Sequence, residues 1–127
     1  MQASILVVDD DASVRGLVVR ILRSWGHAEI GEAGSVAEAL ELADARRPGT
    51  VLVDVGLPDG DGFSLTRQLR ARPWAMRVVV FSSDADPANS AAAERAGAIG
   101  FFPKDELLSP GLRRLLEDRP DDERGAG

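Results

Sequence analysis

The segment Ile5-Leu6-Val7-Val8-Asp9-Asp10-Asp11 is a short apolar run that ends in three aspartates. An uninterrupted run of this length is typical of a strand that is buried on both faces of a parallel sheet. Apolar residues then recur at steps of three and four from Val14 to Trp25, which predicts a helix that stops near Gly26. A buried strand followed at once by an amphipathic helix indicates an α/β protein.

The same alternation continues along the chain. Because each parallel crossover needs a helix-sized connection, five strands separated by helices predict a flavodoxin-like, doubly wound parallel sheet with about five helices. We take the strand order 2-1-3-4-5 from sheets of that class. The further predicted strands are Glu29–Ala33, Thr50–Val53, Arg77–Ser82 and Ile99–Phe102. The further predicted helices are Ser35–Ala45, Phe63–Arg70, Pro87–Ala96 and a last one that starts at Ser109 and Pro110, while residues 56–62 are predicted to be a turn-rich loop.

Composition limits the possible functions. A chain of 127 residues is one domain by length, and we predict a folded domain over residues 1–118 with a disordered tail over 119–127. The net charge of −6 argues against nucleic acid or an anionic membrane as a direct partner. The absence of cysteine excludes disulfides and thiol chemistry. The first residues resemble neither a signal peptide nor a membrane span, so we expect a cytoplasmic protein.

Chemically suggestive residues stand at the ends of four predicted strands. Asp9 and Asp10 follow the first strand, Asp54 the third and Ser82 the fourth, while Lys104 follows the fifth and is the only lysine in the chain. In the adopted strand order these ends are neighbours. Three carboxylates in one cleft repel one another unless a cation neutralises them, and oxygen ligands without His or Cys favour Mg²⁺.

The expected roles follow from where each strand end lies. Asp10 and Asp54, with the backbone carbonyl of Gly56, are the expected direct Mg²⁺ ligands, whereas Asp9 acts through water. Asp54 is the carboxylate best placed to attack phosphorus and form an acyl phosphate. Lys104 can pair with Asp54 before transfer and with a phosphoryl oxygen after it, and the Ser82 hydroxyl can donate to another such oxygen.

Four strings of sequence stand at or around the predicted strand ends: ILVVDDD at residues 5–11, LVDVGLPDGDG at 52–62, VVFSS at 79–83 and AGAIGFFPK at 96–104. Together and in this order they resemble the signatures of response-regulator receiver domains of two-component signalling. The resemblance implies that Asp54 accepts a phosphoryl group from a histidine of a sensor kinase or phosphotransfer protein. It also implies that Asp9 and Asp10 are the acid pair, Ser82 the switch hydroxyl, Phe101 the switch aromatic and Lys104 the phosphate-contacting lysine.

Two features vary this pattern. Many receivers have a proline after the lysine, joined by a cis bond, but here Pro103 precedes Lys104 and Asp105 follows it. We predict a trans bond, since a cis bond before a residue other than proline costs about 3–4 kcal/mol. Gly56 lies two residues beyond Asp54 and has no side chain, and Asp84 lies two residues beyond Ser82 and is an acid. We hypothesise that these two positions set the lifetime of the acyl phosphate by controlling the access of water.

The resemblance also implies a switch. Phosphorylation would draw Ser82 inward, Phe101 would fill the space, and the face made by the fourth helix, fifth strand and fifth helix would change, with dimerisation as one outcome. Phe101 and Phe102 alternate faces, so we expect one in the core and one partly exposed. A DNA-binding module would need many tens of residues beyond Asp118, so a protein target is expected.

Blander readings compete with these roles. Asp9 or Asp11 alone would be a turn former or helix cap, and Trp25 is a core residue. One alternative function is a Mg²⁺-dependent phosphatase that acts on an external phosphoester through Asp54. Such an enzyme usually needs an acid two residues beyond the nucleophile and a cap over the substrate. Here Gly56 occupies that position, and the chain has no cap-sized insertion. Another is an interaction domain that retains the site as a relic. The expected protein is therefore a phosphoacceptor that catalyses only its own phosphorylation and dephosphorylation.

Overall fold

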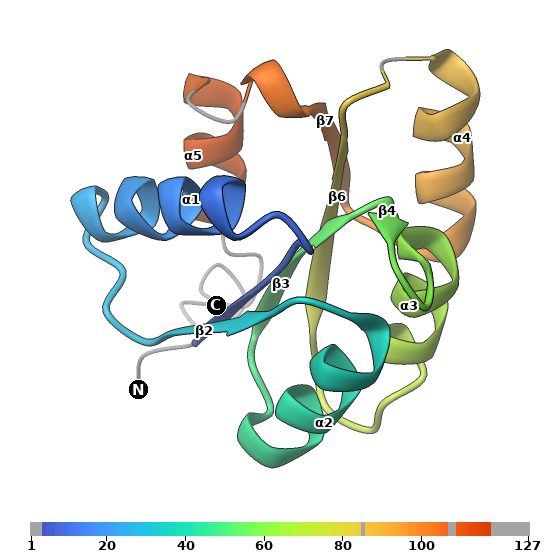
Figure 1. Ribbon diagram of the computed structural model, residues 1–127, viewed down its shortest axis with the longest axis horizontal. Helices are drawn as coiled ribbons and strands as arrows, with labels where there is room; N and C mark the ends of the chain where they lie inside the picture. Colours follow the sequence, from blue (N-terminus) through green and yellow to red (C-terminus); the bar gives the residue numbers. More distant parts are fainter. Residues whose placement is uncertain (1–3, 85, 107–108, 118–127) are drawn as a thin grey trace, which may run out of the picture.

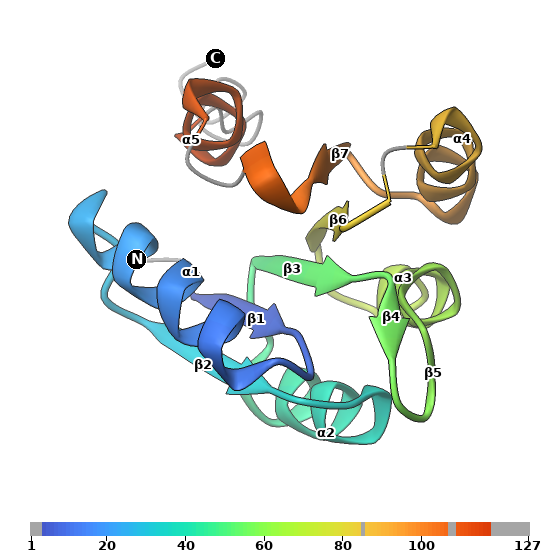
Figure 2. The ribbon, with the colours of Figure 1, turned by 45° about the horizontal axis from the view of Figure 1, so that its top comes forward.

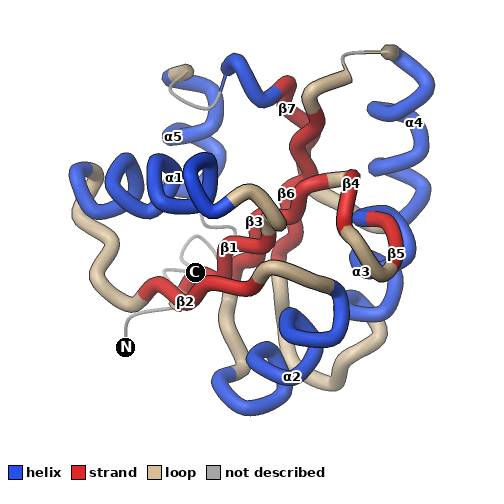
Figure 3. Tube along the Cα trace, viewed as in Figure 1, coloured by secondary structure: helices blue, strands red, loops and turns tan. Residues whose placement is uncertain are grey.

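The computed structural model describes residues 4–84, 86–106 and 109–117. Its centre is one parallel five-stranded sheet in the order β2-β1-β3-β6-β7 (Figures 1 and 3). Since β6 and β7 are the fourth and fifth strands of this sheet along the chain, the order is the predicted 2-1-3-4-5. The strands are β1 Ile5–Val8, β2 Ile30–Ala33, β3 Thr50–Asp54, β6 Arg77–Ser82 and β7 Gly100–Pro103.

Helices cover both faces of the sheet. Figures 1 and 2 show α1 and α5 together on one side, and α2, α3 and α4 on the other. The predicted doubly wound α/β fold is therefore confirmed. The helices are α1 Ala12–Ser24, α2 Val36–Arg46, α3 Gly62–Arg70, α4 Pro87–Ala96 and α5 Pro110–Glu117.

The strands are continuous apolar runs because each strand feeds two cores. Successive side chains of a strand point to opposite faces, so Val8 packs under α2 and α3 whereas Val7 packs against α1 and α5. Val80 and Val79 of β6 divide between the same two cores. Trp25 packs against the second core, as predicted for its place on the α1 stripe.

Two short elements were not predicted. Residues expected to form a turn-rich loop make an antiparallel hairpin of β4 Gly56–Leu57 and β5 Gly60–Asp61, and a 3₁₀ helix, η1, follows β7 at Lys104–Glu106. Elements of two or three residues have no hydrophobic period to detect. Figure 2 shows the hairpin at the end of β3. Within the described residues there is no cis peptide bond, so the predicted trans bond between Lys104 and Asp105 is confirmed.

Strand β7 begins at Gly100 rather than at the predicted Ile99, whose side chain is 41% exposed. Phe101 and Phe102 are both partly buried, one against each core, whereas one core residue and one partly exposed residue were expected. The reason is that β7 lies at the edge of the sheet and has a neighbouring strand on one side only. Both faces of β7 are therefore only partly covered. Residues 118–127, including the predicted tail, lie outside the described residues.

Candidate functional site

The register of the sheet brings the strand ends together. Val8 pairs with Val53, and Asp54 pairs with Phe81, so Asp9 and Asp54 leave adjacent strands at the same level. Ser82 pairs with Pro103, which places Lys104 just beyond the serine's level. The adopted strand order therefore does bring the predicted site residues to one edge of the sheet.

Three carboxylates form the centre of this edge. Asp9, Asp10 and Asp54 each offer an oxygen, and these oxygens lie within 4.8 Å of one another. Asp9 is fully buried, Asp54 is 5% exposed, and Asp10 faces solvent. Two of the three charges are thus removed from water, where an uncompensated carboxylate is costly.

Lys104 supplies the positive charge. Its Nζ lies 2.9 Å from Asp9 Oδ2 and 3.3 Å from Asp54 Oδ2, so one ammonium bridges the ends of β1 and β3. The same Nζ lies 5.9 Å from the centre of the Phe81 ring, which contributes a weak further attraction. The lysine reaches the carboxylates from the start of η1, across the end of β6.

The pKa values of the pair reflect these contacts. Burial, reinforced by repulsion from Asp9, raises the pKa of Asp54, although Lys104 and the Gly56 backbone N–H act in the opposite direction. For Lys104, burial is the largest single influence and lowers the pKa, but the attractions of Asp9 and Asp54 together outweigh it, so the pKa is raised. The ammonium is therefore held in its charged form, while Asp54 carries a charge that its surroundings only partly compensate.

The donor set fits a small divalent cation. Asp9 Oδ2 is buried and accepts no hydrogen bond of acceptable geometry from the described residues, so we treat its contact with Lys104 as an ion pair only. Lys104 contacts two of the three carboxylates, those of Asp9 and Asp54, and all three groups are oxygen donors, which is the chemistry that Mg²⁺ prefers. Asp9, Asp10 and Asp54 are the residues that could hold such an ion, with the nearby Gly56 backbone as a further candidate.

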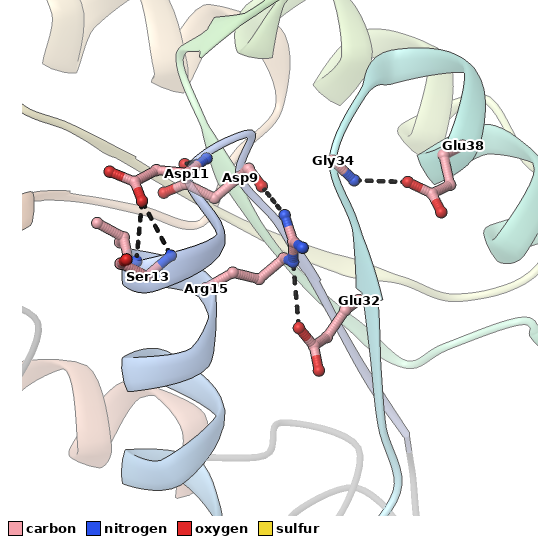
Figure 4. Close-up of polar contacts among 8 residues, drawn as sticks. Asp9, Asp11, Ser13, Arg15, Glu32, Gly34 and Glu38 are labelled. Atoms are coloured by element: carbon pink, nitrogen blue, oxygen red, sulfur yellow. Dashed lines mark hydrogen bonds and ion pairs between the residues drawn. The ribbon is translucent and has the colours of Figure 1, made fainter.

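The loop that carries the acids is fixed by its own hydrogen bonds. The Asp11 N–H donates to Asp9 Oδ1 at 2.9 Å. The Asp11 carboxylate caps α1 by accepting from the N–H groups of Ser13 and Val14, at 2.9 and 3.3 Å (Figure 4). Asp11 is thus a helix cap, and Asp9 makes a turn-forming contact with the N–H two residues on, as the blander reading predicted, although Asp9 also contacts Lys104.

Strand β3, which ends at Asp54, is held close to the start of α3. A Cβ on Gly62 would lie 2.5 Å from the Asp54 carbonyl oxygen, so only glycine lets α3 start this near to the strand end. Over Gly56, by contrast, a Cβ would meet nothing within 4 Å. The space beside the Gly56 Cα is therefore open.

The remaining predicted residues lie farther along the edge. Ser82 is buried, and its Oγ accepts from the Asp84 N–H at 3.0 Å. Phe101 packs against the core beneath α4 and lines a cavity of about 260 Å³ between α4 and β7. The cavity is lined by Ser90, Ala93, Glu94, Ala98, Ile99, Gly100 and Phe101.

The comparisons with known proteins agree with this arrangement. The family model described as the response regulator receiver domain matches residues 5–114. The chain belongs to this family. Its receiver fold spans the whole set of strand-end residues described above.

Three relatives illustrate the similarity of this receiver domain. The DNA-binding transcriptional activator DevR/DosR of Mycobacterium tuberculosis is 38% identical over 115 residues, which cover 90% of this chain and 52% of that protein. The signal receiver domain of the response regulator NarL from the same species shares 31% identity with a TM-score of 0.79, over 93% and 98% of the two chains.

The third is a response regulator from Burkholderia pseudomallei, with 27% identity and a TM-score of 0.74 over 91% of this chain and 72% of that one. Its crystal structure contains a phosphorylated aspartic acid, a calcium ion and citrate. The chain spans about half the length of the curated relatives it matches. No helix among the described residues has the length and apolar character to cross a bilayer.

Two polar residues near the site were missed by sequence reasoning. Arg15 donates to the Asp9 carbonyl, and Asp59 accepts from the Val36 and Ala37 N–H groups at the start of α2. Both contacts join separate elements, and neither leaves a trace in hydrophobic period or motif spacing. The only sequence signal for Asp59 is that it precedes Gly60 in a predicted turn, and this does not indicate which N–H groups its carboxylate would bind.

Proposed function

We propose that this receiver domain accepts a phosphoryl group on Asp54 from a phosphohistidine of a sensor kinase or phosphotransfer protein. The observation that carries the proposal is the Lys104 ammonium, which contacts both Asp9 and Asp54 while Asp10 lies beside them. A site with three carboxylates and one ammonium is suited to phosphoryl transfer, since catalysis there is largely positioning and charge stabilisation. The phosphorylated aspartic acid of the Burkholderia relative supports the same chemistry.

In the proposed transfer, an Asp54 carboxylate oxygen bonds to phosphorus as the bond from phosphorus to the histidine nitrogen breaks. The histidine ring keeps the electron pair of that bond. Lys104 then exchanges its contact with Asp54 for one with a phosphoryl oxygen. Asp9, Asp10, Asp54 and the Gly56 carbonyl would hold Mg²⁺, which supplies positive charge to the transferred group.

The proposed readout is a change at the α4, β7 and α5 face. The Ser82 Oγ now accepts from the Asp84 N–H, and its own proton is free to be donated to a phosphoryl oxygen. Phe101 borders the cavity beside α4, so a rotation of its ring would alter that cavity. A downstream protein, or a second copy of the domain, would recognise the changed face. Equal NMR shifts for Phe101 in resting and activated protein would count against this step.

One relative, DevR/DosR, is a DNA-binding transcriptional activator of which this chain covers 52%. For the receiver domain itself we propose a protein target and no direct contact with nucleic acid. The cytoplasm remains the predicted compartment. Mg²⁺-dependent hydrolysis of an external phosphoester remains the alternative activity, and no observation favours it.

Gly56 and Asp84 remain the proposed determinants of acyl-phosphate lifetime. The open space over Gly56 supports water access, whereas Asp84 Oδ1 already accepts from the Asp86 N–H at 3.0 Å. Asp84→Asn keeps this turn contact and is the control for Asp84→Ala. If Gly56→Asn and Asp84→Ala both leave the dephosphorylation rate unchanged, the hypothesis is wrong.

The decisive experiment is incubation with Mg²⁺ and acetyl phosphate followed by intact mass measurement. We expect a transient gain of one phosphate in the wild type, and none in Asp54→Asn or without Mg²⁺. Asp44→Asn is the matched control, because Asp44 is an exposed carboxylate whose partner is Arg72, away from the site. Phosphate gain that survives Asp54→Asn would refute the proposal.

A further inference from the structure

Arg15 of α1 connects three elements beside the carboxylates. Its Nη1 donates to the Asp9 backbone carbonyl at 2.6 Å, and its Nε donates to Glu32 Oε1 at 3.1 Å. Figure 4 shows the guanidinium lying between the end of β1 and the Glu32 side chain of β2. A single side chain therefore joins α1, the first strand and the neighbouring strand.

The carbonyl that Arg15 contacts belongs to the peptide unit between Asp9 and Asp10. Because that unit is planar, fixing its oxygen also fixes the amide nitrogen of Asp10. The Asp9 side chain has its own anchor, the Asp11 N–H. Asp10 is exposed, so the direction of its carboxylate depends on the main chain that Arg15 holds.

The Glu32 contact orients the guanidinium rather than stabilising the fold. The side chain of Glu32 is 46% exposed, and exposed ion pairs contribute little to stability. The planar guanidinium, however, can donate in two fixed directions at once, which an ammonium cannot reproduce. Glu32 pairs in register with Val7, two residues before Asp9, so it holds Arg15 at the correct height along β1.

We propose that Arg15 is a positioning residue for the cation site, acting through the peptide between Asp9 and Asp10. The inference rests on the proposed function, in which these two aspartates hold Mg²⁺. Residues that orient metal ligands typically change metal affinity by about 10–100-fold when they are replaced. At the cation site Arg15 contacts the Asp9 backbone carbonyl rather than a site carboxylate, so we expect about tenfold, the lower end of that range.

The sign of the effect separates positioning from simple electrostatics. Arg15 is a positive charge near a site for a cation, so its charge alone opposes Mg²⁺ binding. Removing it would tighten binding if the charge mattered most, and would weaken binding if the positioning of Asp10 matters most. The two explanations therefore predict opposite changes in the Mg²⁺ dissociation constant.

The test compares Mg²⁺ dissociation constants by titration calorimetry in the wild type, Arg15→Met, Arg15→Lys and Arg72→Met. Arg72 is the matched control, since it also pairs with an acid, Asp44, and donates to a backbone carbonyl, that of Gln68. We expect a dissociation constant about tenfold higher in Arg15→Met. Arg15→Lys, which retains the charge but not the two-point contact, should also bind more weakly, and Arg72→Met should match the wild type.

A second readout uses the protein without metal. In Arg15→Met the Asp11 amide, which donates to Asp9 Oδ1, should exchange its hydrogen faster, while the urea midpoint stays near that of Arg72→Met. Binding of Mg²⁺ as tight as or tighter than the wild type in Arg15→Met overturns the inference. If Arg15→Met does not fold, wild-type affinity in Arg15→Lys overturns it. Failure of the proposed function is distinct, because then the wild type would neither bind Mg²⁺ nor gain phosphate.

Discussion

Asp54 illustrates how a residue can be costly to the fold at the position where the proposed function requires it. Burial, together with the nearby Asp9, raises its pKa, so its ionised form destabilises the folded state relative to the unfolded chain. The proposed function accounts for that instability, because it places the phosphoacceptor carboxylate where a cation and a phosphoryl group would meet. A stability measurement can therefore detect the site without any phosphodonor.

We expect Asp54→Asn to raise the free energy of unfolding at pH 7 without metal. A raised folded-state pKa means that stability is fully present below the unfolded value of about 3.8 and is lost as the pH rises through the folded-state pKa. The advantage of the asparagine should vanish below that pH, and Mg²⁺ should reduce it at pH 7 by stabilising the wild type. Urea unfolding from pH 3 to 8 is the measurement, and a less stable variant at pH 7 would contradict it.

Lys104 has the opposite role, because it compensates a carboxylate that is fully buried. We expect Lys104→Met to lower the free energy of unfolding by about 3 kcal/mol at pH 7, since it removes the positive charge that contacts the buried Asp9 carboxylate. Mg²⁺ should restore part of the loss. Arg113→Met is the control: Arg113 and Glu117 form an exposed pair, worth about 0–1 kcal/mol. Equal urea midpoints for the two variants would show that Lys104 is not the compensating charge.

Among the elements, the short β4–β5 hairpin links the chain after β3 to the start of α2. Asp59 at its turn accepts from the Val36 and Ala37 N–H groups at 2.7 and 3.0 Å, so a side chain from the hairpin caps α2. Ser35 accepts from the Glu38 N–H, and Glu38 accepts from the Gly34 N–H, which completes the cap (Figure 4 shows the latter contact). The loop after Asp54 is thereby tied to the helix on the same side of the sheet.

This contact predicts a pH-dependent contribution from Asp59. Hydrogen bonds from the Val36 and then the Ala37 N–H lower the pKa of Asp59, so its contribution is present above the unfolded pKa of about 3.8 and lost as the pH falls through the lower folded value. We expect Asp59→Asn to unfold at lower urea concentration at pH 7, with the difference shrinking as the pH falls below the unfolded pKa of about 3.8. A constant difference from pH 7 to pH 2 would mean that the charge of Asp59 has no part in it.

Sequence reasoning succeeded for elements that repeat a pattern over several residues. The strands Ile5–Val8 and Arg77–Ser82 and the helix Pro87–Ala96 match their predicted bounds, because burial on both faces and glycine or proline stops are local signals. The hairpin and η1 were missed because segments of two or three residues are too short to show a hydrophobic period. Neither Phe101 nor Phe102 is fully in the core, although one of them was expected there, because both faces of the edge strand β7 are only partly covered.

The whole molecule is electrically polarised along the strand direction. Each helix runs opposite to the parallel strands, so helices begin at the site edge and end at the far edge. Aspartates cap the first turns at the site edge and arginines occupy the last turns, as the helix dipole favours. The capping acids are Asp11, Asp61 and Asp86, and the last-turn arginines are Arg23, Arg46, Arg67, Arg70, Arg95 and Arg114.

This polarity predicts that Mg²⁺ affinity depends on salt beyond the three site carboxylates. Raising N-methylglucamine chloride from 0.1 to 1 M shortens the screening length from about 10 to about 3 Å, so we expect the Mg²⁺ dissociation constant to increase. The bulky cation avoids direct competition for the site. Titration calorimetry is the measurement, and an unchanged dissociation constant would show that only the nearest charges matter.

The amino-acid pattern was sufficient for the five strands of the main sheet, the five α-helices and the proximity of Asp9, Asp10, Asp54 and Lys104, because burial, capping and the ends of strands are marked by nearby positions. It could not reveal that Lys104 contacts Asp9 more closely than Asp54, that Arg15 holds the Asp9 carbonyl, or that Asp59 caps α2. Those contacts join residues that only the packed sheet and its helices bring within hydrogen-bond range. Distance in space, unlike periodicity, is a property of the complete fold.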